Sequence, residues 1–186
     1  MEWFDISKFS TDIGFTLIIF FLGMGAATFG RMVELNPKRM ACISTLLFFI
    51  GMILVFCSLQ FHLLPMYYVG CSFMGCGTGI GYVSPIKQLL SNFADHKGLA
   101  SGLAITGFGL GKFVAAPAIE YLLTAVSLPT MFLVLAGAFL LIMSVCSWLF
   151  KPNPVFISTV YTAVPISTLV KHTFLTKQYI SVWLMF

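Results

Sequence analysis

The residues of this chain whose types could do chemistry are concentrated at 107–112, where the sequence reads GFGLGK. A phosphate-binding loop requires a glycine five positions before the Gly-Lys pair and a Ser or Thr after the lysine, but Thr106 and Phe113 occupy those positions. The dinucleotide pattern GxGxxG is also broken, because Lys112 replaces its third glycine. Neither nucleotide-binding pattern is complete, so the role of this stretch depends on the segment that contains it.

The composition indicates an integral membrane protein. Of the 186 residues, 59% are hydrophobic and only 9% are charged, against roughly 25% charged residues in soluble domains. The mean hydropathy is +1.00. The formal charge of +4 comes from basic residues scattered between apolar runs, which argues against nucleic acid as a partner.

The apolar segments carry no recognisable catalytic or metal-binding set. They contain no paired carboxylates and no activated nucleophile, so we expect neither enzymatic activity nor a cofactor. The five cysteines form no CxxC pair and have no histidines at metal-ligand spacing, so we expect them to pack helices and to bind no metal. They are Cys42, Cys57, Cys71, Cys76 and Cys146.

Five apolar stretches are each long enough to cross a bilayer, which takes about 20 residues. An outer segment at 1–11 precedes them, and a proline-rich cytoplasmic linker at 151–177 follows. Residues 178–186 begin another apolar run, and because nine helical residues cover only about 14 Å, we expect the chain to end within a truncated helix. The predicted membrane helices are 12–33, 40–60, 65–90, 99–123 and 130–150.

The distribution of lysine and arginine predicts the orientation. If the first helix runs from outside to inside, eight of the ten basic residues lie at or near the cytoplasmic face, and the outer connections at 61–65 and 124–129 have none. The exceptions are Lys8, outside, and Lys112, within a span. The eight are Arg31, Lys38, Arg39, Lys87, Lys97, Lys151, Lys171 and Lys177.

Glycines recur at four-residue spacing in the third and fourth predicted helices. GxxxG spacing allows two helix backbones to approach closely in lipid. One interpretation is static packing, and the other is a smooth surface on which transporter helices rock. The glycines are Gly70, Gly75, Gly77, Gly79 and Gly81 in one helix and Gly98, Gly102, Gly107, Gly109 and Gly111 in the other.

Lys112 is placed deep in the membrane, 14 residues or about 21 Å beyond Gly98. A lysine at mid-span costs about 2.5–3.5 kcal/mol, so it normally faces the bundle interior or a water-filled cavity. In one interpretation Lys112 provides positive potential for an anionic substrate in a central cavity, which Tyr82 could also line. In the other, it pairs with an acid or with carbonyl groups on a neighbouring helix.

The connection at 30–39 contains a glycine, an acid four residues later and a basic pair. This pattern resembles the cytoplasmic signature of the major facilitator superfamily, with glutamate in place of the usual aspartate and Asn-Pro where Phe-Gly is common. The matching residues are Gly30, Arg31, Glu34, Lys38 and Arg39.

A longer stretch, residues 79–117, resembles helices four and five of the branch of that superfamily that contains oxalate/formate antiporters and monocarboxylate carriers. It has a GxGYxSP segment, an aromatic and acid-basic-Gly turn, and then GLAxGLAxxGFGxG with a following proline. The resemblance implies an all-α polytopic membrane protein containing about five helices of the N-terminal repeat and the start of a further span.

The same resemblance implies a carrier of small carboxylates such as oxalate, formate, pyruvate or lactate, moved across a lipid bilayer by exchange or together with protons. In that branch, the basic residues best placed to pair with substrate lie in the second half of the protein. The alternative is a truncated or non-transporting helix bundle that acts as a paralogue or partner subunit. Both explanations leave the oligomeric state and the particular membrane open.

Overall fold

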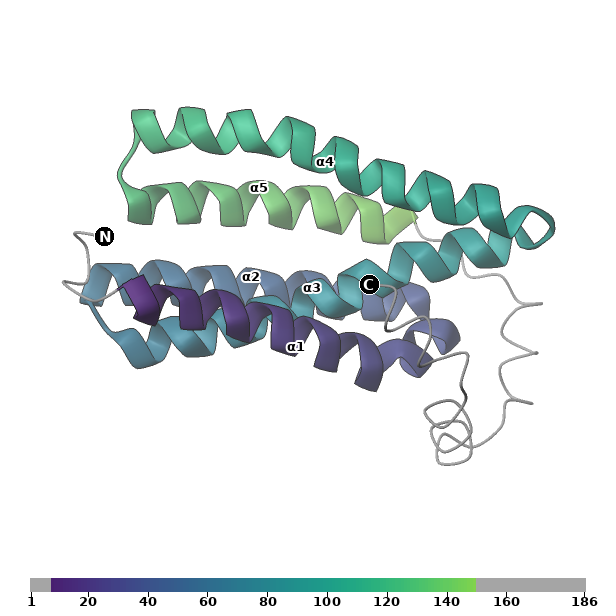
Figure 1. Cartoon of the computed structure of the whole chain (residues 1–186), viewed down its shortest axis with the longest axis horizontal. Coiled ribbons are helices and arrows are strands. Elements are labelled where there is room, and N and C mark those ends of the chain that lie inside the picture. Colours follow the sequence, from purple (N-terminus) through teal and green to yellow (C-terminus); the bar gives the residue numbers. More distant parts are fainter. Residues whose placement is uncertain (1–7, 150–186) are drawn as a thin grey trace. The chain divides into compact units, whose positions relative to one another are not determined.

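The computed structural model describes residues 8–149, which form five α-helices and one short 3-10 turn (Figure 1). No strand occurs among these residues, so the prediction of an all-α chain with about five membrane helices is confirmed. Most of the predicted outer segment, the linker at 151–177 and the run at 178–186 lie outside the described residues. The elements are α1 (Lys8–Leu35), α2 (Pro37–Phe61), α3 (Leu64–Asn92), η1 (Ala94–His96), α4 (Lys97–Ala125) and α5 (Leu128–Leu149).

Prolines mark where several of these helices begin. Pro37 is the first residue of α2, and Pro65 and Pro129 are the second residues of α3 and α5. Proline suits these positions because its fixed φ matches the helix and its missing N–H would have no partner in the first turn. At the other end of α2, His62 adopts a left-handed conformation (φ 54°) and its N–H bonds the Ser58 carbonyl, which ends the helix.

Helix α3 lies at the centre of the helix contacts. It packs mainly against α1 and α2, and α5 packs against α2, whereas α4 makes few contacts with the other helices (Figure 1). Two apolar clusters join α1, α2 and α3: one around Val33, Met40 and Ile80, and one around Val55, Leu59 and Cys71. The first three helices therefore form the best-packed part of the described chain.

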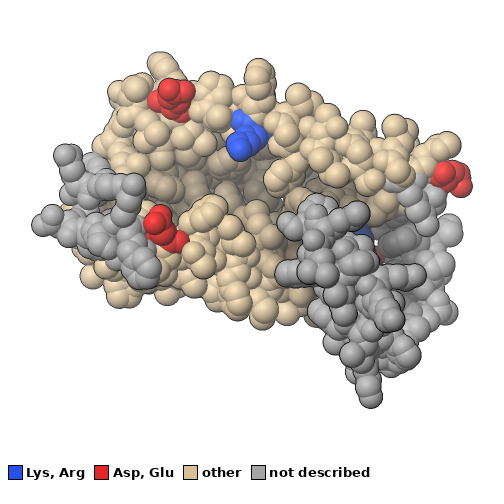
Figure 2. Space-filling view, in the orientation of Figure 1, with Lys and Arg blue, Asp and Glu red and all other residues tan. Residues whose placement is uncertain are grey.

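Judged by length and composition alone, four of the five described helices could cross a membrane: α1, α2, α4 and α5. The exception is the glycine-rich α3, which is covered by its neighbours and presents less surface to lipid. On the face drawn in Figure 2, charged side chains are few and lie apart on a largely uncharged surface. These features describe an integral, multi-pass membrane protein.

The glycines of α3 lie where other backbones come closest. A Cβ added to Gly75 would lie 2.5 Å from the carbonyl oxygen of Ile18 on α1, and one added to Gly77 would lie 2.7 Å from the amide nitrogen of Phe48 on α2. Real Cβ atoms do not approach this closely, so glycine is required at both positions. Successive residues of a helix are about 100° apart, so glycines two apart face opposite sides, and the run GCGTGIG at 75–81 alternates between α1 and α2.

Candidate functional site

An apolar cavity of about 490 Å³ lies between α3 and α4. Its α3 wall includes Tyr82 and Leu89, and its α4 wall includes Leu103 and Phe108. The rings of Tyr82 and Phe108 meet edge to face, with centroids 5.2 Å apart and an interplanar angle of 87°. This arrangement places the positive edge of one ring against the negative face of the other, so the aromatic pair ties α3 to the otherwise loosely packed α4.

Lys112 lies one helical turn beyond Phe108 on the same side of α4, about 6 Å further along the axis. Its side chain is exposed, and within residues 8–149 it has neither an ion pair nor a hydrogen bond. The nearest acid along α4, Glu120, is eight residues or about 12 Å further on. Among the described residues, therefore, no acid balances the charge of Lys112.

Of the two residues that we expected to share a cavity, Tyr82 lines the α3–α4 cavity and Lys112 does not. Phe108, which no sequence motif indicated as a site residue, contacts Tyr82 and lies one helical turn before Lys112. The position of Phe108, four residues before Lys112, could have indicated it in the sequence, since residues at this spacing lie on the same side of a helix.

The glycines of α4 have surroundings unlike those of α3. A Cβ added to any of the five would meet no atom within 4 Å among the described residues. No described helix packs closely on them, so their predicted role in close helix contact stays a prediction. These glycines are Gly98, Gly102, Gly107, Gly109 and Gly111.

At the predicted cytoplasmic end, Glu34 of α1 forms an ion pair with Lys87 of α3. The two side chains are 22% and 35% exposed, respectively, so the pair is partly accessible to solvent. The other members of the loop motif do not join it: Arg31, Lys38 and Arg39 are exposed, and a Cβ on Gly30 would meet no neighbouring atom. The loop pattern indicated Glu34 but not its partner, because Lys87 is 53 positions away in the chain.

The fold and the site first define a class of protein: a polytopic α-helical membrane protein with a charged loop motif between its first two helices and an ionisable residue within an apolar helix. The family model described as Major Facilitator Superfamily matches residues 1–186. The chain therefore belongs to the major facilitator superfamily, as its loop motif and glycine-rich segment indicated.

The chain is also similar to vertebrate members of the monocarboxylate branch. Monocarboxylate transporter 12-B of Danio rerio is 35% identical over 78 residues, which is 42% of this chain and 16% of that protein. Monocarboxylate transporter 12 of Homo sapiens is 35% identical over 78 residues, which is 42% of this chain and 15% of that protein. The matched segment thus spans less than a fifth of the length of these relatives. No solved structure is significantly similar to the chain.

Proposed function

We propose that this protein takes part in the transport of small carboxylates across a membrane by alternating access. The observation that carries the proposal is Lys112, a cation within a span that has no counter-charge among the described residues. An ionisable residue at this depth is a functional candidate by default. Membership of the superfamily and similarity to proteins named monocarboxylate transporters support an anion as its partner.

Lys112 favours entry of a carboxylate by offsetting the cost of removing the anion from water. A hydrogen bond between two charged groups is about twice as strong as a neutral one. The hydroxyl of Tyr82, on α3 beside Phe108, is the second hydrogen-bond donor that we propose for the same anion. Oxalate, formate, pyruvate and lactate all fit this requirement, and either exchange or proton coupling is compatible with it.

The packing differences among the helices suggest which parts move. Helix α3 is held between α1 and α2 by close backbone contacts, so these three helices move as one unit. Helix α4 has few contacts and shifts relative to them as the cavity opens and closes. The partly exposed ion pair between Glu34 and Lys87 stabilises one end of the α1–α3 contact during this movement.

The test is uptake of labelled oxalate, formate, pyruvate and lactate into proteoliposomes that contain the full-length protein. A charge-assisted hydrogen bond contributes about 1.5–3 kcal/mol, so Lys112→Ala should lower uptake of the preferred substrate by about tenfold or more. Lys112→Arg keeps the charge and should retain a larger share of the activity. Unchanged uptake by a well-folded Lys112→Ala protein would remove Lys112 from the mechanism.

The open glycines of α4 favour a second candidate function, that of a non-transporting helix bundle that partners another membrane subunit. A helix from such a subunit could approach α4 closely at these positions. This candidate predicts no uptake of any of the four carboxylates, together with a stable complex that survives purification. Replacing Gly102 and Gly109 with leucine should then disrupt the complex without unfolding the protein.

A further inference from the structure

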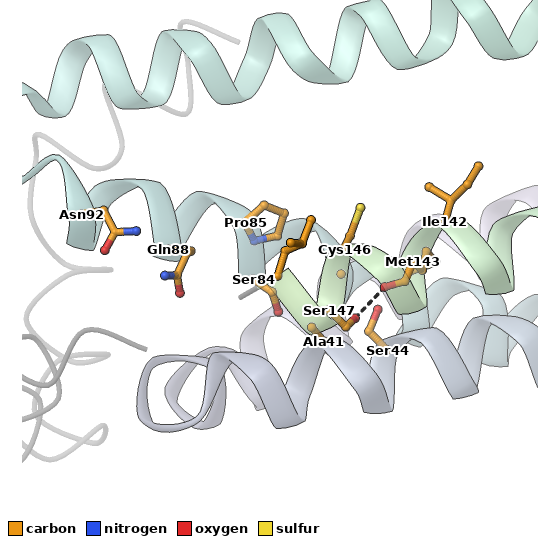
Figure 3. Close-up of a pocket in the computed structure, with 12 residues that line it drawn as sticks. Ala41, Ser44, Ser84, Pro85, Gln88, Asn92, Ile142, Met143, Cys146 and Ser147 are labelled. Carbon is orange, nitrogen blue, oxygen red and sulfur yellow. Dashed lines mark hydrogen bonds between the residues drawn. The ribbon is translucent and has the colours of Figure 1, made fainter. Parts of the chain in front are cut away.

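A second cavity, of about 620 Å³, opens between α2, α3 and α5 (Figure 3). Pro85 is the one residue that it shares with the α3–α4 cavity. Gln88 and Asn92 line it near the end of α3, and Cys146 lines it near the end of α5 (Figure 3). The orientation predicted from the basic residues places these helix ends in the cytoplasmic leaflet. We call this cavity the α2–α3–α5 crevice.

The inner wall of the crevice suits hydrocarbon. Its three buried serine hydroxyls already donate hydrogen bonds: Ser44 to the Gly77 carbonyl at 2.7 Å, Ser84 to the Ile80 carbonyl at 2.9 Å and Ser147 to the Met143 carbonyl at 2.7 Å. No buried side-chain polar atom among the described residues lacks a partner. An apolar chain can therefore enter without leaving a buried donor unsatisfied.

The cytoplasmic mouth of the crevice has the opposite character. Lys38 lies on the same side of α2 as Ala41 and Thr45, one turn nearer the cytoplasm, and its side chain is exposed. The exposed carboxamide of Asn92 lies at the end of α3. Among the described residues, no acid lines the crevice, and the acid nearest to Lys38 in sequence, Glu34, is paired with Lys87. Lys38 is not itself a lining residue, but it lies one turn from the lining residue Ala41, so an exposed cation lies beside a crevice whose described lining contains no acid.

We propose that the α2–α3–α5 crevice binds an anionic phospholipid of the cytoplasmic leaflet. One acyl chain occupies the space between the helices, and the phosphate headgroup contacts Lys38 and the carboxamide of Asn92. Basic pockets between membrane helices on this side attract anionic headgroups. The charge complementarity at the mouth distinguishes this occupant from a neutral lipid, and the site is independent of the transport function proposed above.

Two native cysteines, Cys146 and Cys42, allow occupancy of the crevice to be measured by chemical labelling. Cys146 lines the crevice and is exposed, whereas Cys42 is exposed on α2 outside the crevice lining. The full-length protein is placed in nanodiscs of phosphatidylcholine with increasing phosphatidylserine. It is then treated with N-ethylmaleimide, and adducts at each cysteine are quantified by peptide mass spectrometry. Phosphatidylserine should slow labelling of Cys146 relative to Cys42.

Two matched substitutions locate the headgroup. Lys38→Gln should raise the phosphatidylserine fraction needed for half-protection by about fivefold, the factor that corresponds to about 1 kcal/mol per basic residue near the surface. Arg39→Gln removes the same charge at the same depth, but Arg39 shares its side of α2 with the exposed Ile43 and Leu46. Arg39→Gln should therefore change the phosphatidylserine fraction needed for half-protection much less than Lys38→Gln does. High salt should reproduce the Lys38→Gln result without a mutation, because it screens the headgroup contact.

Three results would overturn the proposal. Equal protection of Cys146 in pure phosphatidylcholine would mean that a neutral lipid occupies the crevice. Protection in detergent without added lipid would mean that the protein itself covers it. Equal labelling of Cys146 and Cys42 in every mixture would mean that nothing occupies it. None of these results depends on whether the protein transports a carboxylate.

Discussion

Helix α3 is enclosed by α1 and α2, whereas α4 contacts its neighbours over a small part of its length. Both helices carry glycines at four-residue spacing. In α3 a Cβ added to Gly75, Gly77 or Gly79 would collide with backbone atoms of α1 or α2, and in α4 an added Cβ would enter open space among the described residues. The same sequence pattern therefore occurs in a tightly packed helix and in an unpacked one.

The lysines of the two helices differ in the same way. Lys87 lies near the end of α3 and is paired with Glu34, whereas Lys112 lies within the span of α4 and has no ion-pair partner among the described residues. A paired charge at a helix end serves packing, while an unpaired charge at mid-span is costly unless a ligand or another helix balances it. The comparison favours a structural role for α3, and it is α4 that carries the charge on which the proposed function depends.

The largest expected effect on folding and packing comes from substituting the glycines of α3. Gly79→Leu places a side chain against the Leu22 carbonyl of α1, where backbone must move to accommodate it. Overpacking costs about 1–3 kcal/mol even where side chains can adjust, so we expect little monodisperse protein by size-exclusion chromatography. Gly109→Leu on α4 is the control and should purify like the unmodified protein. Similar behaviour of the two variants would contradict the difference between the helices.

Removing the charge within α4 should have the next largest effect. Lys112→Leu eliminates an insertion cost of about 2.5–3.5 kcal/mol, so resistance to thermal unfolding in detergent should increase while carboxylate uptake falls. Lys87→Leu on α3 should instead lower the unfolding temperature, because it leaves Glu34 without its partner. A destabilised Lys112→Leu protein would show that this lysine has a structural partner.

A smaller effect is expected at the aromatic contact between the two helices. Phe108→Ala removes the edge-to-face contact with Tyr82, which contributes about 0.5–1.5 kcal/mol beyond the buried area. Because α4 has few other contacts, the loss should appear as faster hydrogen exchange in α4 with little change in α3. Phe113→Ala, at an exposed position on the same helix, should leave both exchange rates unchanged.

The smallest effect should come from the ion pair between Glu34 and Lys87. Partly exposed pairs contribute about 0.2–1 kcal/mol, so a double-mutant cycle with Glu34→Gln and Lys87→Gln should give a coupling energy within that range. The coupling should decrease at high salt because the pair is accessible to screening ions. A coupling energy near zero at low salt would show that the contact does not stabilise the α1–α3 packing.

Much of the architecture followed from local properties of the chain. Long apolar runs predicted five helices, and the prolines at 37, 65 and 129 occupy the first or second position of a helix, where a missing N–H has no cost. The loop at 30–39 and the segment at 79–117 indicated the superfamily that the family model then matched. The site was less accessible to prediction: Lys112 and Tyr82 stood out by residue type, but Phe108 and Lys87 did not.

The sequence by itself determined that the chain is a membrane protein and where its helices lie, because hydropathy and helix length depend only on residues adjacent in the chain. Only the tertiary structure decided which glycines are close to another backbone, which lysine is paired and where the α2–α3–α5 crevice opens. These features depend on the side of each helix that faces a neighbour and on residues such as Glu34 and Lys87 that are far apart in sequence. In lipid, where burial of apolar surface does not select one face of a helix over another, close packing and polar contacts make that choice.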